Sequence, residues 1–322
     1  MVSGTNDRYL KTDVALPIIR EIAEPYLWAY DLVTPVPEDR LAFMYLYDDT
    51  GMSSDSKKEK PPEHKIGAKF PEVDVGRISS GADVISERGF QMRIPDSVLN
   101  DPVLGGTELS RLFKTAGFWF AEIDNSSILS NLKSGANTTT SYFSPGNTWD
   151  SSSATPVTDI VDFKHDMTTE GKPFRMNQVF IDNENFYEMS EHLINADIDG
   201  AKQQRIMGMP TMGEDYIDVP VFGRVSGVES GMTEGSIMGV DTRNPVGEMH
   251  YYNNPKYSVP SFSYTTNNPA TGAVEEITIP NMGYNFYQYH EDDTHDTVMQ
   301  FWVTNDTIVK DSYGVLYASS GI

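Results

Sequence analysis

The stretch from His290 to His295 is the most direct candidate for a metal site, because it combines two histidines with three acidic residues. A zinc-protease helix has its two histidines four residues apart, so that both imidazoles project from one face. Here the interval is five residues, which would turn the imidazoles to different sides of a helix. The spacing and the acidic neighbours favour a surface loop over a metal site.

A second candidate, Asn195 to Gly200, resembles the start of a calcium-binding loop. Such a loop begins with Asp and has a bidentate Glu at its twelfth position. The corresponding residues here are Asn195 and Ile206, so the ligand that contributes most to affinity is missing. We interpret the stretch as the end of a helix, with a weak cation site as the alternative.

Other motifs of catalysis are absent from the sequence. There is no cysteine, and we find no Gly-x-Ser-x-Gly elbow, phosphate-binding loop or dinucleotide fingerprint. The glycine-rich stretch 227–239 has two glutamates and no lysine, which does not suit phosphate. Three asparagines fall in Asn-x-Ser/Thr sequons that we expect to be mostly unmodified: Asn125, Asn137 and Asn305. We therefore predict no catalytic residue, no cofactor, no metal ligand and no enzyme activity.

The charge of the chain is strongly negative, with 47 acidic against 24 basic residues and a formal net charge of −23. Such an excess makes the compact state repel itself unless salt screens it, and the Debye length falls to about 3 Å at 1 M salt. The composition therefore favours a protein of a high-salt environment, with an ordinary acidic protein as the alternative. It disfavours tight binding to nucleic-acid phosphates. The local exception is a lysine-rich run that we interpret as a solvated loop: Lys57, Lys58, Lys60, Lys65 and Lys69.

Neither a membrane span nor a signal peptide is visible in the sequence. No apolar run approaches the roughly 20 residues that a membrane helix needs, and the segment Met1 to Asp13 is polar. We expect the protein to be made in the cytoplasm and to stay out of membranes.

The strongest structural signal is a long amphipathic helix from Thr107 to Ser134. Thr107 is the expected N-cap, Gly135 the expected end, and Gly117 and the polar run 124–127 are points where the helix could bend. Its apolar residues recur at helical intervals: Leu109, Leu112, Phe113, Ala116, Phe120, Ile123, Ile128, Leu129 and Leu132.

The chain before this helix predicts an arm and a projecting hairpin. Four prolines interrupt residues 1 to 40, which we interpret as an arm without its own packing, with a short helix within 16–28. A strand is expected at 41–47. Residues 70–94 predict two strands around a turn at 79–81, followed by a short helical turn at 95–97.

The chain after the helix predicts a sheet with helices packed on it. Residues 135–154 read as a linker with Trp149 as a buried anchor, and Thr155 and Pro156 open a helix that ends near Gly171. A strand at 178–181 and a helix capped by Asn185 follow. Strand-like pieces at 217–225 and 275–279 lie in an irregular region, and alternating residues from 298 onward predict strands that return to the core.

This order of elements resembles the major capsid protein of tailed viruses, the Hong Kong 97-like fold that encapsulins share. Local marks are Glu87 to Pro95, similar to the returning strand of the extended loop, and Trp149 followed by 156–160, 171 and 179–181, similar to the entry into the axial domain. The resemblance implies an α+β fold with five parts: an N-terminal arm (1–40), a peripheral strand and extended loop (41–95), a spine helix and peripheral domain (96–148), an axial domain (149–285) and C-terminal strands returning to the peripheral domain (286–322).

The resemblance also implies a function. Family members assemble as hexamers and pentamers into icosahedral shells around double-stranded DNA, without tight sequence-specific binding. Together with the acidity, it implies a virion protein of a tailed virus of a halophilic archaeon, assembled in the host cytoplasm, with minor capsid, decoration, scaffold and portal proteins as further partners. The alternatives are an encapsulin-like compartment shell and, less favoured, a secreted acidic β-rich hydrolase or surface-layer protein.

Overall fold

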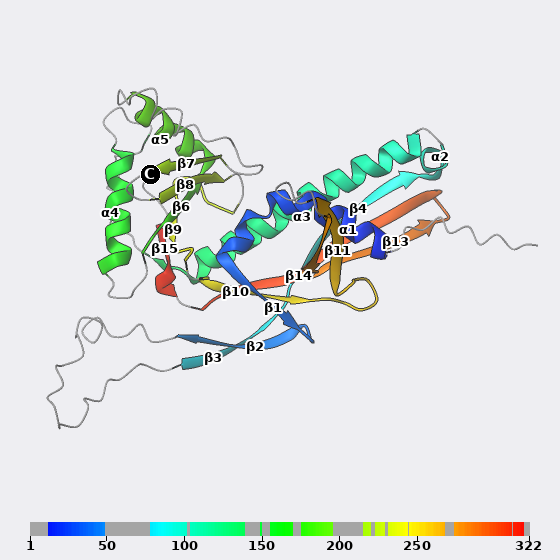
Figure 1. Cartoon of the computed structure of the whole chain (residues 1–322), viewed down its shortest axis with the longest axis horizontal. Coiled ribbons are helices and arrows are strands. Elements are labelled where there is room, and N and C mark those ends of the chain that lie inside the picture. The colour runs from blue at the N-terminus through cyan, green and yellow to red at the C-terminus, as the bar shows by residue number, and fades with distance from the viewer. Residues whose placement is uncertain are drawn as a thin grey trace, which may run out of the picture.

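The structure is a computed structural model in which two β-sheets share one long helix, and two hairpins project from the body (Figure 1). No helix in the part of the chain that it describes is both long and apolar enough to cross a membrane. The described residues are 12–48, 78–101, 104–138, 149, 155–169, 175–195, 215–219, 223–228, 231–243, 245–267, 274–310 and 312–318.

The long helix α3 spans Leu104–Gly135, 32 residues, or about 48 Å at 1.5 Å per residue. It begins three residues before the expected N-cap Thr107, because Asp101 Oδ1 accepts the N–H of Leu104 at 2.9 Å and caps the helix there. The predicted end at Gly135 is confirmed. The expected weak points do not interrupt the helix, and Gly117 instead allows α1 to approach closely, since a Cβ there would lie 2.6 Å from Ile22 Cγ2.

The N-terminal segment is packed, so its interpretation as an arm is wrong for residues 12–38. Helix α1 (Thr12–Ala23) buries Leu16 and Ile19 against α3, and includes part of the predicted short helix. Two 3-10 helices, η1 (Glu24–Tyr26) and η2 (Trp28–Leu32), lead into strand β1 (Val33–Glu38). Residues 1–11 lie outside the described part of the chain.

The first sheet has the order β1-β10-β14-β13, with β4 paired to β14 as its fifth strand. Strand β14 is 14 residues long, which lets it pair with β10 near its end and with β4 and β13 near its start. Phe286, Phe301 and Met299 on one face pack against Phe120 of α3 and against α1. The strand bounds are β4 (Glu87–Pro95), β10 (Gly247–Tyr252), β13 (Tyr284–Glu291) and β14 (Asp296–Val309), and α2 (Asp96–Leu99) is the predicted helical turn after β4.

The second sheet has the order β5-β15-β9-β6-β8-β7 and packs with helices α4 (Pro156–Thr169) and α5 (Asn183–Asn195). Trp149 is fully buried in its core, as expected. The cap of α5 is Asp182 rather than Asn185, since its Oδ1 accepts the Asn185 N–H at 3.2 Å. The strands are β5 (Asn137–Thr138), β6 (Gln178–Asp182), β7 (Asp215–Val219), β8 (Gly223–Val228), β9 (Ile237–Val240) and β15 (Val315–Ala318), and η3 (Ser312–Gly314) precedes β15.

The two sheets divide the chain differently from the predicted boundaries. Strand β10 belongs to the first sheet, so residues 149–285 do not form one unit and the change of sheet comes between β9 and β10. Of the strands in the predicted C-terminal part, β13 and β14 return to the first sheet, whereas the last strand, β15, joins the second. The predicted strand at 217–225 is two antiparallel strands, β7 and β8.

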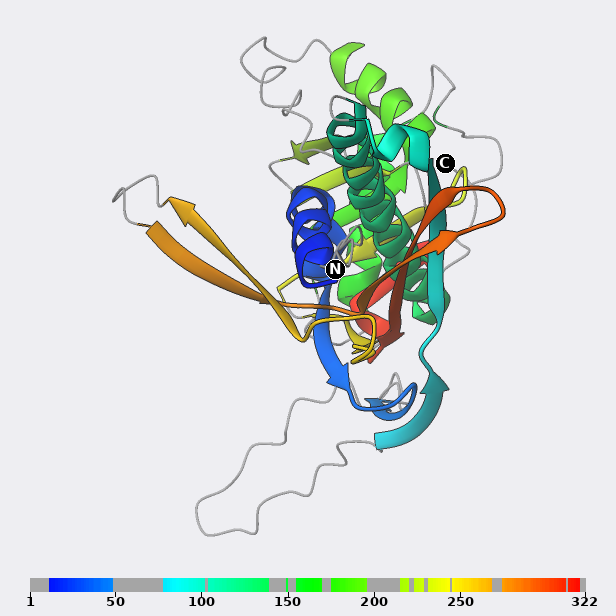
Figure 2. The same ribbon diagram turned by 90° about the vertical axis from the view of Figure 1, so that its right-hand side faces the viewer.

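The two projecting hairpins extend away from both sheets (Figure 2). The first pairs β2 (Ala42–Asp48) with β3 (Ile78–Val84), and the expected turn at 79–81 is wrong because these residues lie inside β3. The residues between 48 and 78, including the lysine-rich run, lie outside the described part. The second pairs β11 (Ser261–Asn267) with β12 (Val274–Pro280), and β12 confirms the strand expected at 275–279.

Candidate assembly surface

One face of the β2–β3 hairpin is exposed, and its three residue pairs nearest the body carry no charge. The register pairs Ala42 with Val84, Met44 with Ala82 and Leu46 with Ser80, and opposed residues of an antiparallel pair share a face. The exposed fractions are 76% for Met44, 59% for Leu46 and 62% for Val84. We call these six residues the hairpin face. Contiguous exposed apolar surface of this kind marks interaction sites in soluble proteins.

The opposite face of the hairpin attaches it to the first sheet. Phe43 is buried, and its ring stacks on the imidazole of His250 with the centroids 4.0 Å apart. Ile85 and Ile308 complete this small cluster. His250 Nδ1 lies 2.7 Å from Glu38 Oε1, which ties β10 to β1 beneath the ring. The hairpin is therefore anchored at its base.

A buried polar cluster fixes the middle of α3. Asp124 is fully buried and accepts hydrogen bonds from the hydroxyl of Tyr30, from the hydroxyl of Tyr284 at 2.7 Å and from the amide of Asn305 at 3.1 Å. We call these four residues the Asp124 cluster. The neighbouring Asn125 bonds the backbone of η1 and η2, donating to the carbonyl of Tyr26 at 2.7 Å and accepting the N–H of Ala29 at 3.2 Å.

Burial dominates the electrostatics of this cluster. It raises the pKa of Asp124, although hydrogen bonds from Tyr30 and Tyr284 act in the opposite direction. Burial, with the nearby Asp124 charge, also raises the pKa of both tyrosines well above the usual range. Their hydroxyls remain protonated donors at neutral pH. The cluster thus joins α3 to η2, β13 and β14, and it has a structural rather than a chemical role.

The structure places the predicted chemical candidates on separate elements. His290 lies at the end of β13 and His295 in the turn before β14 with a φ of 55°, so these two do not share a helix. Across the described ranges, no group of three His, Asp or Glu side chains could hold a metal ion. Asn195 is the last residue of α5, as interpreted, while residues 196–200 lie outside those ranges.

The glycosylation sequons and the glycine-rich stretch also have structural explanations. Asn125 and Asn305 are buried, which leaves no room for a glycan on either amide. Asn137 lies in β5. Gly231 and Gly235 have φ values of 92° and 72°, so the glycines there serve a turn before β9.

Sequence reasoning missed both the hairpin face and the Asp124 cluster. The cluster has a visible signal, because Phe120, Asp124 and Ile128 are spaced four residues apart and an acidic residue in an apolar stripe must find partners. The hairpin face has a weaker one. Alternation of Ala42, Met44 and Leu46 defines two faces but does not say which one the body covers.

Comparison with known proteins identifies the fold. Scans of the sequence against protein families and curated proteins match nothing. Among solved structures, the chain is similar to the capsid of an empty GTA particle (TM-score 0.54, 11% identity, covering 92% of this chain and 90% of that one). It is also similar to a virus-like particle from Pyrococcus furiosus (TM-score 0.51, 10% identity, covering 92% and 97%) and to the capsid of a native GTA particle (TM-score 0.52, 11% identity, covering 92% and 91%). The predicted α+β Hong Kong 97-like capsid fold is confirmed.

Proposed function

We propose that this chain is a major capsid protein that assembles as hexamers and pentamers into an icosahedral shell around double-stranded viral DNA. The observation that supports it most is the uncharged hairpin face, centred on Met44 and Leu46, on a fold shared with shell-forming proteins. A two-stranded hairpin has no core of its own, so an exposed apolar face on it gains burial by association, here with another copy of the chain. The proposal assigns the chain no enzymatic role.

In this proposal, each of the two sheets corresponds to one domain of the capsid fold. The first sheet with α3 would form the peripheral domain and the spine helix, and the second sheet with α4 and α5 the axial domain. The β2–β3 hairpin would be the stem of the extended loop. Lysines 57–69 fall between its strands, and their positive charge suits contact with the acidic surface of a neighbouring copy.

The charge supports a container for DNA in high salt. A net charge of −23 disfavours strong binding of the chain to DNA phosphates, and weak binding favours the packaging and release of the DNA. The same charge makes contacts between copies depend on screening, so we infer a tailed virus of a halophilic archaeon, with assembly in the host cytoplasm. Minor capsid, decoration, scaffold and portal proteins would be the further partners.

Electron microscopy of the purified protein and of native particles tests this function, first in molar NaCl and then at low salt. We expect closed icosahedral shells that weaken as salt is removed, and nuclease-resistant double-stranded DNA in native particles. Shells without DNA would favour an encapsulin-like compartment instead. Dispersed monomers in both buffers, with or without added scaffold, would contradict the proposal.

A further inference from the structure

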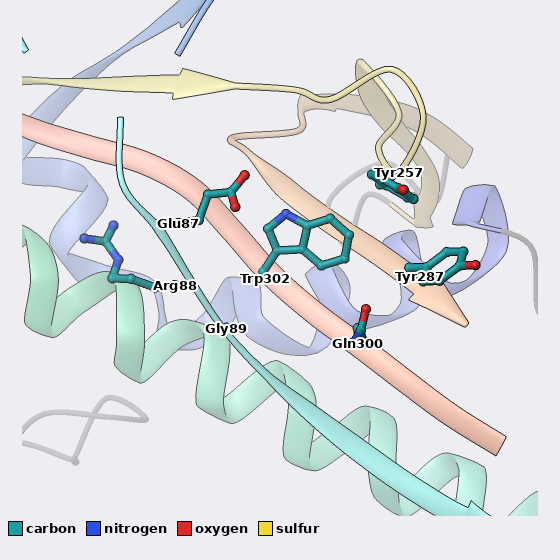
Figure 3. A pocket seen from close by; sticks show the side chains of 7 residues that line it. All are labelled: Glu87, Arg88, Gly89, Tyr257, Tyr287, Gln300 and Trp302. Atoms are coloured by element: carbon teal, nitrogen blue, oxygen red, sulfur yellow. The ribbon is translucent and has the colours of Figure 1, made fainter. Parts of the chain in front are cut away.

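An open hollow of about 370 Å³ lies on the outer face of the first sheet, opposite the face that packs on α3 (Figure 3). Three aromatic residues from three elements surround it: Tyr257 from the loop after β10, Tyr287 from β13 and Trp302 from β14. Glu87 and Gln300 lie at its rim. Its size is within the roughly 300–1,000 Å³ range of small-molecule sites.

The backbone holds the three rings in place. Phe286 N–H donates to the carbonyl of Tyr257 at 2.9 Å, which fixes the loop against β13. The ring of Tyr257 meets the edges of Tyr287 and Trp302 at centroid distances of 5.4 and 5.3 Å. Gly89 lies opposite Trp302 on β4, and a Cβ there would collide with the Cβ of Trp302. The hollow is thus a built feature of the sheet.

The polar groups around the hollow are available to a ligand. Glu87 is exposed, and in the described part of the chain neither its carboxylate nor the amide of Gln300 nor the indole N–H of Trp302 has a hydrogen-bond partner. The hydroxyl-bearing ring of Tyr287 is 41% exposed. The site therefore offers aromatic surface together with an unused carboxylate, amide and N–H donor.

This combination disfavours two other kinds of ligand. A purely apolar partner would bury Glu87 and Gln300 without hydrogen bonds, which is costly. A nucleic acid would face the Glu87 carboxylate in a strongly acidic chain, and the guanidinium of Arg88 is already committed to the carbonyl of Asn305 at 2.9 Å. Among the described residues, Lys256 also lies beside the hollow, with its ammonium over the ring of Tyr257 at 4.8 Å.

We propose that this hollow binds a neutral saccharide. A pyranose ring presents an apolar C–H face that can stack on the indole of Trp302 and a rim of hydroxyls that both donate and accept hydrogen bonds. Glu87 would accept hydrogen bonds from those hydroxyls, and Gln300 would both accept and donate. The inference does not require shell assembly.

The sheet offers further positions for a longer chain of sugars. Tyr289 stacks on Tyr287 with the centroids 5.8 Å apart, and it lies beyond Tyr287 along β13. The row through Tyr287 and Gln300 continues to Gln91 on β4. A second ring can therefore contact tyrosine and amide groups without any change in the fold.

Saturation-transfer NMR of the full chain with neutral oligosaccharides of glucose, galactose, mannose and N-acetylglucosamine tests the proposal. We expect transfer from at least one of these sugars, with affinity that stays constant between low and molar NaCl because no net charge is neutralised. Trp302→Leu and Glu87→Ala should each weaken binding by about tenfold, the loss of one stacking or hydrogen-bonding contact.

Two controls keep the result interpretable. Trp119→Ala removes an exposed indole on α3, away from the hollow, and should bind as the unchanged chain does. Glu87 is exposed, so its variant keeps the fold even if Trp302→Leu does not. The proposal is overturned if no sugar of the panel shows transfer, if Glu87→Ala binds undiminished, or if a single-stranded oligonucleotide competes for the site at low salt.

Discussion

The hydroxyl of Tyr284 donates to Asp124 Oδ2 across 2.7 Å and joins the first residue of β13 to the middle of α3. The same carboxylate accepts bonds from Tyr30 and Asn305, which come from near the two ends of the chain. A single buried side chain thus holds together the N-terminal segment, the long helix and the first sheet.

Replacing Asp124 by Asn tests the electrostatics of this junction. Because burial raises the pKa of Asp124 above its usual value of about 3.9, folding favours the protonated acid, and the stability that the acid contributes is lost as pH rises through the raised pKa. Asn does not titrate. The free energy of unfolding of the unchanged chain relative to Asp124→Asn should therefore fall as pH rises above about 4, measured by urea unfolding at constant salt.

Asp124→Ala is the companion variant. It leaves Tyr30, Tyr284 and Asn305 buried without their acceptor, and should lower the free energy of unfolding by about 3 kcal/mol. If the free energy of unfolding of the unchanged chain instead rose with pH relative to that of Asp124→Asn, the hydrogen bonds to Asp124 would outweigh its burial, contrary to our assignment.

Two glycines with opposite surroundings provide a matched prediction. Gly283 has a φ of 91°, and a Cβ there would collide with the carbonyl of Thr304. Gly106 lies in the first turns of α3 with nothing near its missing Cβ. Gly283→Ala should therefore destabilise by about 1–3 kcal/mol, and Gly106→Ala should stabilise by about 0.5–1 kcal/mol. Thermal unfolding of both variants checks the opposite signs, and equal effects would contradict the argument.

Local patterns predicted elements well where one chain segment decides them. The apolar period of α3 and its end at Gly135 depend on nearby residues, as does the proline start of α4. The start of α3 was misjudged because Thr107 and Asp101 are both acceptable caps and only the structure shows which one is used. Gly81 suggested a turn, yet it lies in β3 opposite Tyr45, whose ring occupies the space that a Cβ would fill.

The pairing of strands that lie far apart in the chain could not be predicted from the sequence. Strand β1 contains Pro35 and Pro37, which argued against any strand. It lies at the edge of the sheet, where a residue without an N–H on the outer side loses no hydrogen bond to a neighbouring strand. The predicted unit 149–285 is wrong for a similar reason, because it includes β10. Which sheet β10 and β15 join depends on partners more than 50 residues away, β14 and β9 respectively. The hairpin face and the hollow at Trp302 are products of that pairing.

The contacts that anchor the β2–β3 hairpin should be removable without destabilising the rest of the fold. Phe43→Ala removes the ring that stacks on His250 and packs near Ile308, which should lower the free energy of local opening by about 3 kcal/mol. Hydrogen exchange should accelerate in residues 42–48 and 78–84 and stay unchanged in α3. Met44→Ala, on the exposed side, is the control and should leave exchange as it is; acceleration in both variants would contradict the assignment of faces.

The hairpin face itself should matter for assembly and not for folding. Met44 and Leu46 are exposed, so changing both to Asp should alter the free energy of unfolding of the isolated chain by no more than about 0.5 kcal/mol. In an interface, however, two carboxylates would be buried opposite an acidic neighbour, at a cost of several kcal/mol. We therefore expect Met44→Asp/Leu46→Asp to abolish shells seen by electron microscopy and light scattering in molar NaCl. Met44→Leu/Leu46→Met keeps the face apolar and should still assemble; normal shells from the Asp variant would show that this face is not a contact between copies.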